Sequence, residues 1–277
     1  MRDTLPEIGA FVALGDSFTE GLGDSYPDGA GHRGWADRFA ERLAVGRPGL
    51  RYANLAVRGK VIADVVADQV PLAMAMAPDL ASIAAGGNDL LRPRSDPDAL
   101  AGAFEAIVVD LRAAGSQVMV FTGFDPRTFP VIRLIRGKAA AYNMHLRAIA
   151  DRNGCLLVDL WSMRVLDDPR EWSPDRLHLS SDGHRRVALR ACEVVGVSVD
   201  EDWREPLPVR LTTEPILART AARSRATVLA QTADWLAARR LDARWAREHA
   251  MPWFSRRIRG VSTGDGIPPK RPEMLPL

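Results

Sequence analysis

Four short polar clusters in this sequence hold residue types that could together perform nucleophilic catalysis. The first is Gly15-Asp16-Ser17-Phe18, which directly follows an apolar run over residues 8–14. A serine hydroxyl is a weak nucleophile until a neighbouring base removes its proton. Taken alone, a Ser and an Asp after a strand are more often ordinary turn residues. Ser17 is therefore a candidate nucleophile that needs support from elsewhere in the chain.

The second cluster, Ser173 to His178, offers a base and a group that could orient it. Asp175 and His178 are three residues apart, so they can share a tight turn in which the carboxylate reaches the imidazole. That contact would fix the tautomer and stabilise the imidazolium that forms when the base takes a proton. The same residues could also form a capped loop before a helix, and both descriptions can hold together. His184 is a rival base, but it falls inside a predicted helix, so we favour His178.

The other two clusters could bind a developing negative charge. Asn88, in the run Gly86 to Asp89, could offer its side-chain amide, and Gly59 could offer its backbone N–H. Each of these is more often a turn residue when taken singly. Together, the four clusters contain a nucleophile, a base with an orienting acid, and oxyanion donors, which is the set that an acyl-transfer site needs.

The elements around these clusters predict a fold that gathers them. Short apolar runs predict strands, and longer amphipathic segments predict helices between them. The strands are expected at 8–14, 51–55, 79–84, 117–122 and 155–158; the helices are expected at 35–43, 62–74 with a bend or end at Pro71, 97–114, 134–151 and 181–195. This alternation predicts a three-layer α/β/α fold with an open, five-stranded parallel sheet. Active sites of such folds lie beyond the carboxyl ends of the strands, and three of the clusters directly follow strands.

The order of the clusters resembles the pattern of SGNH (GDSL-type) hydrolases. The family's first block is usually Gly-Asp-Ser-Leu, and Phe18 replaces the leucine here. The stretch from Gly21 to Arg38 also resembles bacterial esterases of this kind, and the resemblance covers residues 8 to 195. It implies a flavodoxin-like SGNH hydrolase fold. It also implies these roles: Ser17 as nucleophile, His178 and Asp175 completing the triad, and an oxyanion hole formed by the Ser17 amide, Gly59 and Asn88.

The resemblance further implies hydrolysis of a small-molecule or lipid-like ester through an acyl-enzyme, with neither metal nor cofactor. The family also includes carbohydrate O-deacetylases, thioesterases and lysophospholipases, so these activities stay open. A non-enzymatic binding module is a weaker alternative, because no member of the triad or oxyanion set is missing. Acyl-chain preference depends on loops such as 21–34 and 124–136. The second loop places Phe124, Phe129 and Ile132 near Arg127, Arg133 and Arg136.

Composition and charge exclude several classes of protein. The 277 residues are 47% hydrophobic and 26% charged, which is typical of a globular protein. The net charge of +2 is no signature of a polyanion-binding protein, so we expect no nucleic-acid partner. Cys155 and Cys192 are expected to be buried free thiols. Since no secretory signal or transmembrane segment is visible, we expect a cytoplasmic location.

The strand–helix alternation stops near residue 198, and this predicts a division into a hydrolase domain, 1–200, and a basic, largely helical extension, 201–277. Between Arg210 and Arg259 there are eleven arginines and four acidic residues. The simplest interpretation is an amphipathic helix packed on the hydrolase domain with a solvated arginine face. A surface for anionic lipid or nucleic acid, an active-site lid and a dimer contact are alternatives. The sequence leaves open whether the chain forms a homo-oligomer.

Overall fold

The computed structural model describes residues 7–129, 132–208 and 263–277. The chain divides into two compact units, Met1–Arg204 together with Ser262–Leu277, and Glu205–Val261. The helix expected within the basic extension lies outside the described residues. The predicted domain boundary at residue 200 therefore stays a prediction.

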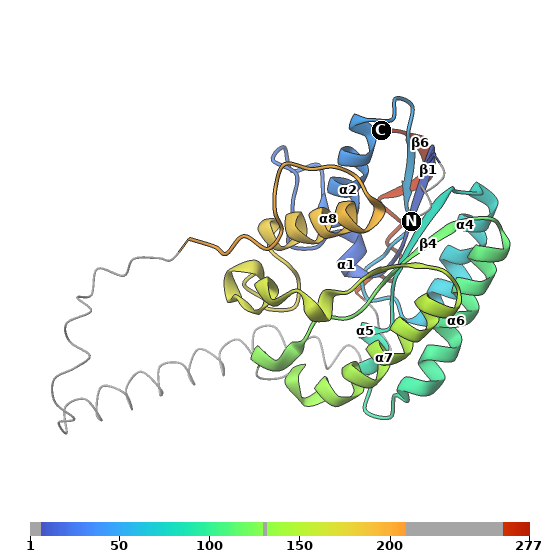
Figure 1. Cartoon of the computed structure of the whole chain (residues 1–277). Helices are drawn as coiled ribbons and strands as arrows, with labels where there is room; N and C mark the ends of the chain where they lie inside the picture. The colour runs from blue at the N-terminus through green and yellow to red at the C-terminus, as the bar shows by residue number, and fades with distance from the viewer. Residues whose placement is uncertain (1–6, 130–131, 209–262) are drawn as a thin grey trace, which may run out of the picture. The chain divides into compact units, whose positions relative to one another are not determined.

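A six-stranded sheet forms the centre of the first unit, with the strand order β5-β4-β3-β1-β2-β6 (Figure 1). The first five strands are parallel: β1 (Ala10–Gly15), β2 (Arg51–Asn54), β3 (Leu80–Ala84), β4 (Gln117–Phe121) and β5 (Leu156–Val158). They confirm the five strands expected from the sequence.

The sixth strand, β6 (Arg271–Pro276), pairs antiparallel with β2 and corrects the prediction of a five-stranded sheet. Its sequence, RPEMLP, contains two prolines, which cannot donate to a hydrogen-bond ladder and are depleted from strands. Proline is tolerated on an edge strand, which is where β6 lies. The pattern of this segment therefore gave no strand signal.

Helices cover both faces of the sheet, which explains why most positions of its parallel strands are apolar. Alternate residues of β1 enter two separate cores: Phe11 and Ala13 enter one, and Val12 and Leu14 enter the other. The first core includes residues of α2 (Gly34–Val45) and α8 (Ser181–Val195), which pack together. The second includes residues of α4 (Val70–Met76), α6 (Pro97–Ala113) and α7 (Arg136–Arg152). Figure 1 shows these two helical layers on opposite sides of the sheet. The predicted three-layer architecture is confirmed.

Local sequence signals set several helix boundaries. Asp96 caps α6 by accepting a hydrogen bond from the Asp98 amide, and Ser180 caps α8 by accepting one from the Gly183 amide. The helix expected at 62–74 is instead α3 (Ile62–Asp64), a π-helical turn (Val65–Gln69) and α4. The π turn precedes Pro71, which lacks the N–H that a regular α-helix needs.

Short helical segments complete the structure. Two follow strands directly, α1 (Ser17–Glu20) after β1 and α5 (Gly87–Leu90) after β3. The 3₁₀ turns are Pro126–Thr128, Ile132–Ile135, Leu160–Ser162, Arg164–Asp167 and Pro169–Glu171. Within the ranges that the structure describes, the helices lack the combination of length and apolar character that crossing a membrane requires.

Candidate active site

Ser17 begins the short helix α1 at the carboxyl end of the central strand β1. Asp16 caps this helix, because its Oδ1 accepts a hydrogen bond of 3.1 Å from the Phe18 amide. Gly15 has a φ of 148°, and a Cβ atom at this position would overlap the carbonyl oxygen of Ala84 on β3. Only glycine permits this close approach. The glycine before Asp16 thus fixes the Ser17 turn against the neighbouring strand.

Asp175 and His178 lie on one tight turn between Trp172 and α8. His178 Nδ1 is 2.7 Å from Asp175 Oδ2. Asp175 Oδ1 accepts hydrogen bonds from the Leu177 and His178 amides at 3.0 and 3.1 Å. Burial raises the pKa of Asp175, but these hydrogen bonds, led by that from the His178 side chain, outweigh burial and leave the pKa below its ordinary value. The carboxylate stays ionised and holds the imidazole by Nδ1, so that Nε2 is the nitrogen left to exchange a proton.

Ser17 and His178 line the same cavity, which has a volume of about 140 Å³. Most of its walls are apolar side chains: Phe18, Leu22, Ala84, Ala85, Phe121, Phe124, Leu160, Leu166, Trp172, Leu177 and Leu179. The turn after β1 and the loop before α8 are therefore brought together, as expected of the carboxyl edge of a parallel sheet. The described contacts of Ser17 and His178 include no hydrogen bond between the two side chains. Such bonds are often long before a substrate is bound.

The Asn88 side chain links the Ser17 turn to the segment that carries Gly59. Asn88 Nδ2 donates to Asp16 Oδ2 at 3.0 Å and to Lys60 O at 2.9 Å. Asp16 precedes Ser17 and Lys60 follows Gly59, so the Asn88 amide joins the two segments. Although all of these residues are described, the cavity lining includes neither Gly59 nor Asn88. Both hydrogens of the Asn88 amide are engaged in these two bonds.

His184, the rival base in the sequence, has a structural position. Its Nδ1 accepts a hydrogen bond from the Trp35 amide at 3.1 Å, and its Nε2 lies 3.0 Å from Leu22 O. The ring is fully buried, and burial lowers the pKa of His184 to about 4. These contacts make His184 a neutral link between α8 and the loop that follows α1.

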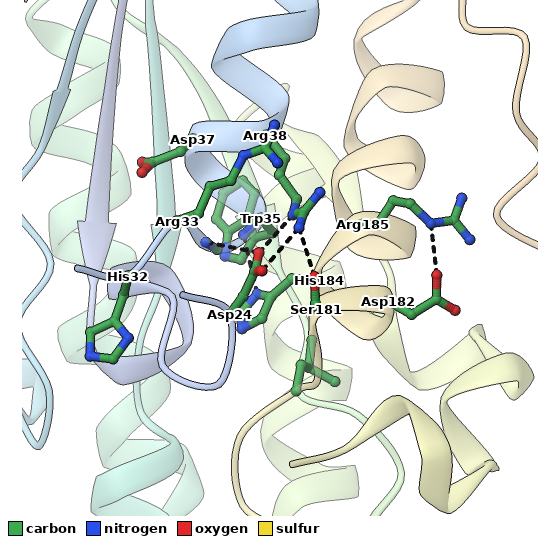
Figure 2. Close-up of polar contacts among 12 residues, drawn as sticks. Asp24, His32, Arg33, Trp35, Asp37, Arg38, Ser181, Asp182, His184 and Arg185 are labelled. Carbon is green, nitrogen blue, oxygen red and sulfur yellow. Dashed lines mark hydrogen bonds and ion pairs between the residues drawn. The ribbon is translucent and has the colours of Figure 1, made fainter. Parts of the chain in front are cut away.

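The loop between α1 and α2 is also held by Asp24, which is almost fully buried. Asp24 accepts hydrogen bonds from Arg38 Nε at 2.6 Å and from the Gly34 amide at 3.2 Å. Arg38 continues to Ser181 Oγ at 2.8 Å, so that α2, α8 and the loop share one polar network (Figure 2). This network supports the wall of the cavity to which the loop contributes Leu22.

Sequence reasoning missed much of the cavity wall. Phe124 was expected near the site and lines the cavity, but Leu160, Leu166 and Trp172 come from a segment that was not singled out. Trp172 packs against Phe124 and Phe129, with ring centroids 4.4 and 4.7 Å apart. A tryptophan three residues before Asp175 was the only signal in the sequence that could have indicated this wall.

Two of the three arginines expected beside the cavity form ion pairs. Arg136 pairs with Asp125 at 2.7 Å, and Arg127 pairs with Asp167. The first pair joins the start of α7 to the loop after β4, and the second joins that loop to the 3₁₀ turn Arg164–Asp167, which follows β5. Both cysteines are free thiols; Cys192 is buried as expected, but Cys155 is only partly buried. Within the described part of the chain, no group of three or more His, Cys, Asp or Glu side chains is placed to hold a metal ion.

Comparison with known proteins identifies the family to which this arrangement corresponds. Residues 13–186 match the model of the GDSL-like lipase/acylhydrolase family. By sequence, no curated protein matches the chain. Among solved structures, a variant of Axe2, an acetyl xylan esterase from Geobacillus stearothermophilus, is 23% identical with a TM-score of 0.59, over 71% of this chain and 100% of that chain. LAE5, an alpha/beta hydrolase from the metagenome of Lake Arreo, Spain, is 22% identical with a TM-score of 0.58, over 68% and 95%. TesA is 23% identical with a TM-score of 0.56, over 67% and 97%. At these identities the likeness establishes a common fold.

Proposed function

The chain belongs to the GDSL-like lipase/acylhydrolase family and is an ester hydrolase of the serine type, and from this premise we propose that it forms an acyl-enzyme on Ser17. The observation that supports this most directly is the shared cavity. Ser17 and His178 both line it, and His178 is held through Nδ1 by the ionised carboxylate of Asp175. A nucleophile, a base and an orienting acid in this order are the elements of a Ser-His-Asp triad.

In the proposed mechanism, His178 Nε2 removes the proton from Ser17 Oγ while that oxygen attacks the ester carbonyl carbon. Asp175 stabilises the resulting imidazolium through the 2.7 Å contact with Nδ1. The carbonyl oxygen becomes an oxyanion, for which the Ser17 amide, the Gly59 amide and the Asn88 side chain are the proposed donors. Collapse of the tetrahedral intermediate breaks the bond to the alcohol oxygen, which takes the proton from His178.

The second half of the cycle releases the acid. A water molecule gives a proton to His178 Nε2 and attacks the acyl carbon, and a second tetrahedral intermediate forms in the same oxyanion site. Its collapse returns the proton to Ser17 Oγ and frees the carboxylic acid.

The cavity supports an apolar acyl group as the substrate's acid part. Its volume of about 140 Å³ is close to that of an apolar protein cavity that binds benzene, so we expect room for about six carbon atoms. This favours a short to medium acyl ester over an acetylated carbohydrate, which would leave most of the apolar wall unused. A thioester or a lysophospholipid could supply a similar acyl group, and these remain alternatives. A cytoplasmic location stays a prediction from the sequence, and self-association stays an open question.

The test is ester hydrolysis by the wild type and by Ser17→Ala, with p-nitrophenyl esters as substrates. We expect Ser17→Ala to lower kcat by at least about 10³-fold, because a triad acts as a unit. Ser198→Ala, a change at an exposed serine after α8, is the matched control and should leave kcat unchanged. Equal rates for the wild type and Ser17→Ala across the ester series would refute the proposal.

A further inference from the structure

The segment that carries Gly59 is anchored to the helix that carries Ser17. Glu20, in the last position of α1, accepts a hydrogen bond of 2.6 Å from the Arg58 amide through Oε2. Its Oε1 accepts a second bond of 2.9 Å from Arg58 Nε, and the two side chains form an ion pair. Glu20 thus binds both the main chain and the side chain of the residue directly before Gly59.

The residues on the other side of Gly59 are anchored to α5. Lys60 O accepts a hydrogen bond from Asn88 Nδ2, and the Ile62 amide donates to Asp89 Oδ2 at 3.1 Å. Gly59 is therefore enclosed between two fixed points, one on α1 and one on α5. The segment cannot shift relative to Ser17 unless at least one of these anchors breaks.

The anchor formed by Glu20 contains a buried carboxylate. The residue is only 5% exposed, and removing a carboxylate from water is costly unless charged and hydrogen-bonded partners replace the water. Arg58 supplies these partners from 38 positions away in the chain. Oxyanion stabilisation depends on donors placed to within a few tenths of an ångström, so a rigid link between nucleophile and donor has a direct use at this place.

We propose that Glu20 and Arg58 are positioning residues that set the distance between the Gly59 amide and Ser17. This inference rests on the proposed function, since it takes the Gly59 amide as an oxyanion donor. Neither side chain is required to touch the substrate. Their effect should therefore be on kcat, where the transition state is stabilised, and not on substrate binding.

The test compares Glu20→Ala, Glu20→Gln and Arg58→Met with the wild type. Loss of one oxyanion donor typically lowers kcat by about 10² to 10³-fold, so displacement of one should lower it by roughly 10 to 100-fold. We expect this loss in Glu20→Ala and Arg58→Met, with KM within about twofold of the wild type. Glu20→Gln keeps an acceptor for the Arg58 amide, so it should recover part of the activity.

A second readout separates positioning from a general effect on folding. An alkyl trifluoromethyl ketone adds to a serine and forms an oxyanion, whereas a ground-state ester analogue does not. The Ki of the trifluoromethyl ketone should rise in each variant by the same factor by which kcat falls. Rates are expressed per site titrated to completion with a fluorophosphonate, so that unfolded protein does not count. Glu105→Ala, which breaks an ion pair with Arg152 between α6 and α7, is the matched control and should change neither quantity.

Two results would overturn the inference. One is a kcat of Glu20→Ala, per titrated site, within twofold of the wild type. The other is a fall in kcat with no change in the Ki of the trifluoromethyl ketone. Should Glu20→Ala fail to fold, Glu20→Gln and Arg58→Met answer the same question. Failure of the proposed function looks different, because the wild type would then neither hydrolyse esters nor react with the fluorophosphonate.

Discussion

The cavity beside Ser17 predicts how the reaction rate depends on acyl-chain length. Burying one methylene group in an apolar environment is worth about 0.8 kcal/mol, which corresponds to about fourfold in kcat/KM. Four methylenes separate acetate from hexanoate, so a fully buried chain would gain about 3 kcal/mol, or roughly two hundredfold. The volume of about 140 Å³ fits about six carbons. We therefore expect kcat/KM to rise from acetate to hexanoate and to level off or fall at octanoate.

The assay measures kcat/KM for p-nitrophenyl esters of two to twelve carbons, below their aggregation limits. Leu166 is 4% exposed and lines the cavity, and Leu166→Ala removes three carbon atoms from the wall. This variant should shift the optimum toward longer chains by up to about three carbons. Leu100→Ala is the matched control, because Leu100 packs in the opposite core. A preference for acetate over butanoate and hexanoate would refute the acyl-pocket argument and favour a deacetylase.

Two further predictions concern stability. Burial lowers the pKa of His184 to about 4, below that of an unfolded histidine, so this group's stabilisation is present above about pH 6.5 and is lost as the pH falls toward 4. In urea unfolding experiments, the free energy of unfolding of the wild type should fall by about 2 kcal/mol between pH 7 and pH 5. His184→Gln should not show this fall, and parallel pH profiles of the two proteins would contradict the prediction. Lys270 Nζ donates to His32 O at 2.9 Å, Arg33 O at 2.7 Å and Asp37 Oδ2 at 2.9 Å. Lys270→Met should therefore destabilise the protein by about 2–4 kcal/mol. The control is Lys138→Met, at a lysine that donates to Pro93 O and Ser95 Oγ and not to a carboxylate, and it should not have this effect. Equal unfolding midpoints for Lys270→Met and the wild type would contradict the proposed role of Lys270.

The sequence predicted the parts of the fold that local chemistry determines. Four of the five parallel strands are almost continuous apolar runs because helices cover both faces, and such runs are recognisable without any tertiary information. The helix starts at Asp96 and Ser180 are local features too, because each side chain accepts a hydrogen bond from an amide two or three residues further along the chain. The Asp175–His178 pair was also predictable, because its partners are three residues apart and their contact forms within a single turn.

Contacts between distant segments could not be predicted in this way. Leu160 and Leu166 of the cavity wall lie in 3₁₀ turns and Trp172 directly follows one, and such short turns have no hydrophobic period of their own. Nothing in the local sequence marks Glu20 and Arg58 as partners. They meet only because β1 and β2 pair in parallel and bring the segments that follow them together. The strand β6 was missed because its two prolines are compatible only with an edge, and the sequence did not indicate which edge was open.

The hydrogen bonds of Asn88 bear on how much that residue can contribute to the proposed mechanism. Its Nδ2 already donates to Asp16 Oδ2 and to Lys60 O, so the amide has no third hydrogen for an oxyanion. Binding the oxyanion must therefore replace or share an existing bond, and its net gain is smaller than that of a new one. The Asp16 carboxylate is the acceptor more readily exchanged for another anion, since the charge on the acceptor is preserved. In the proposed mechanism Asp16 holds the Asn88 amide ready before the substrate arrives, and Asn88 stabilises the oxyanion less than a newly formed hydrogen bond would.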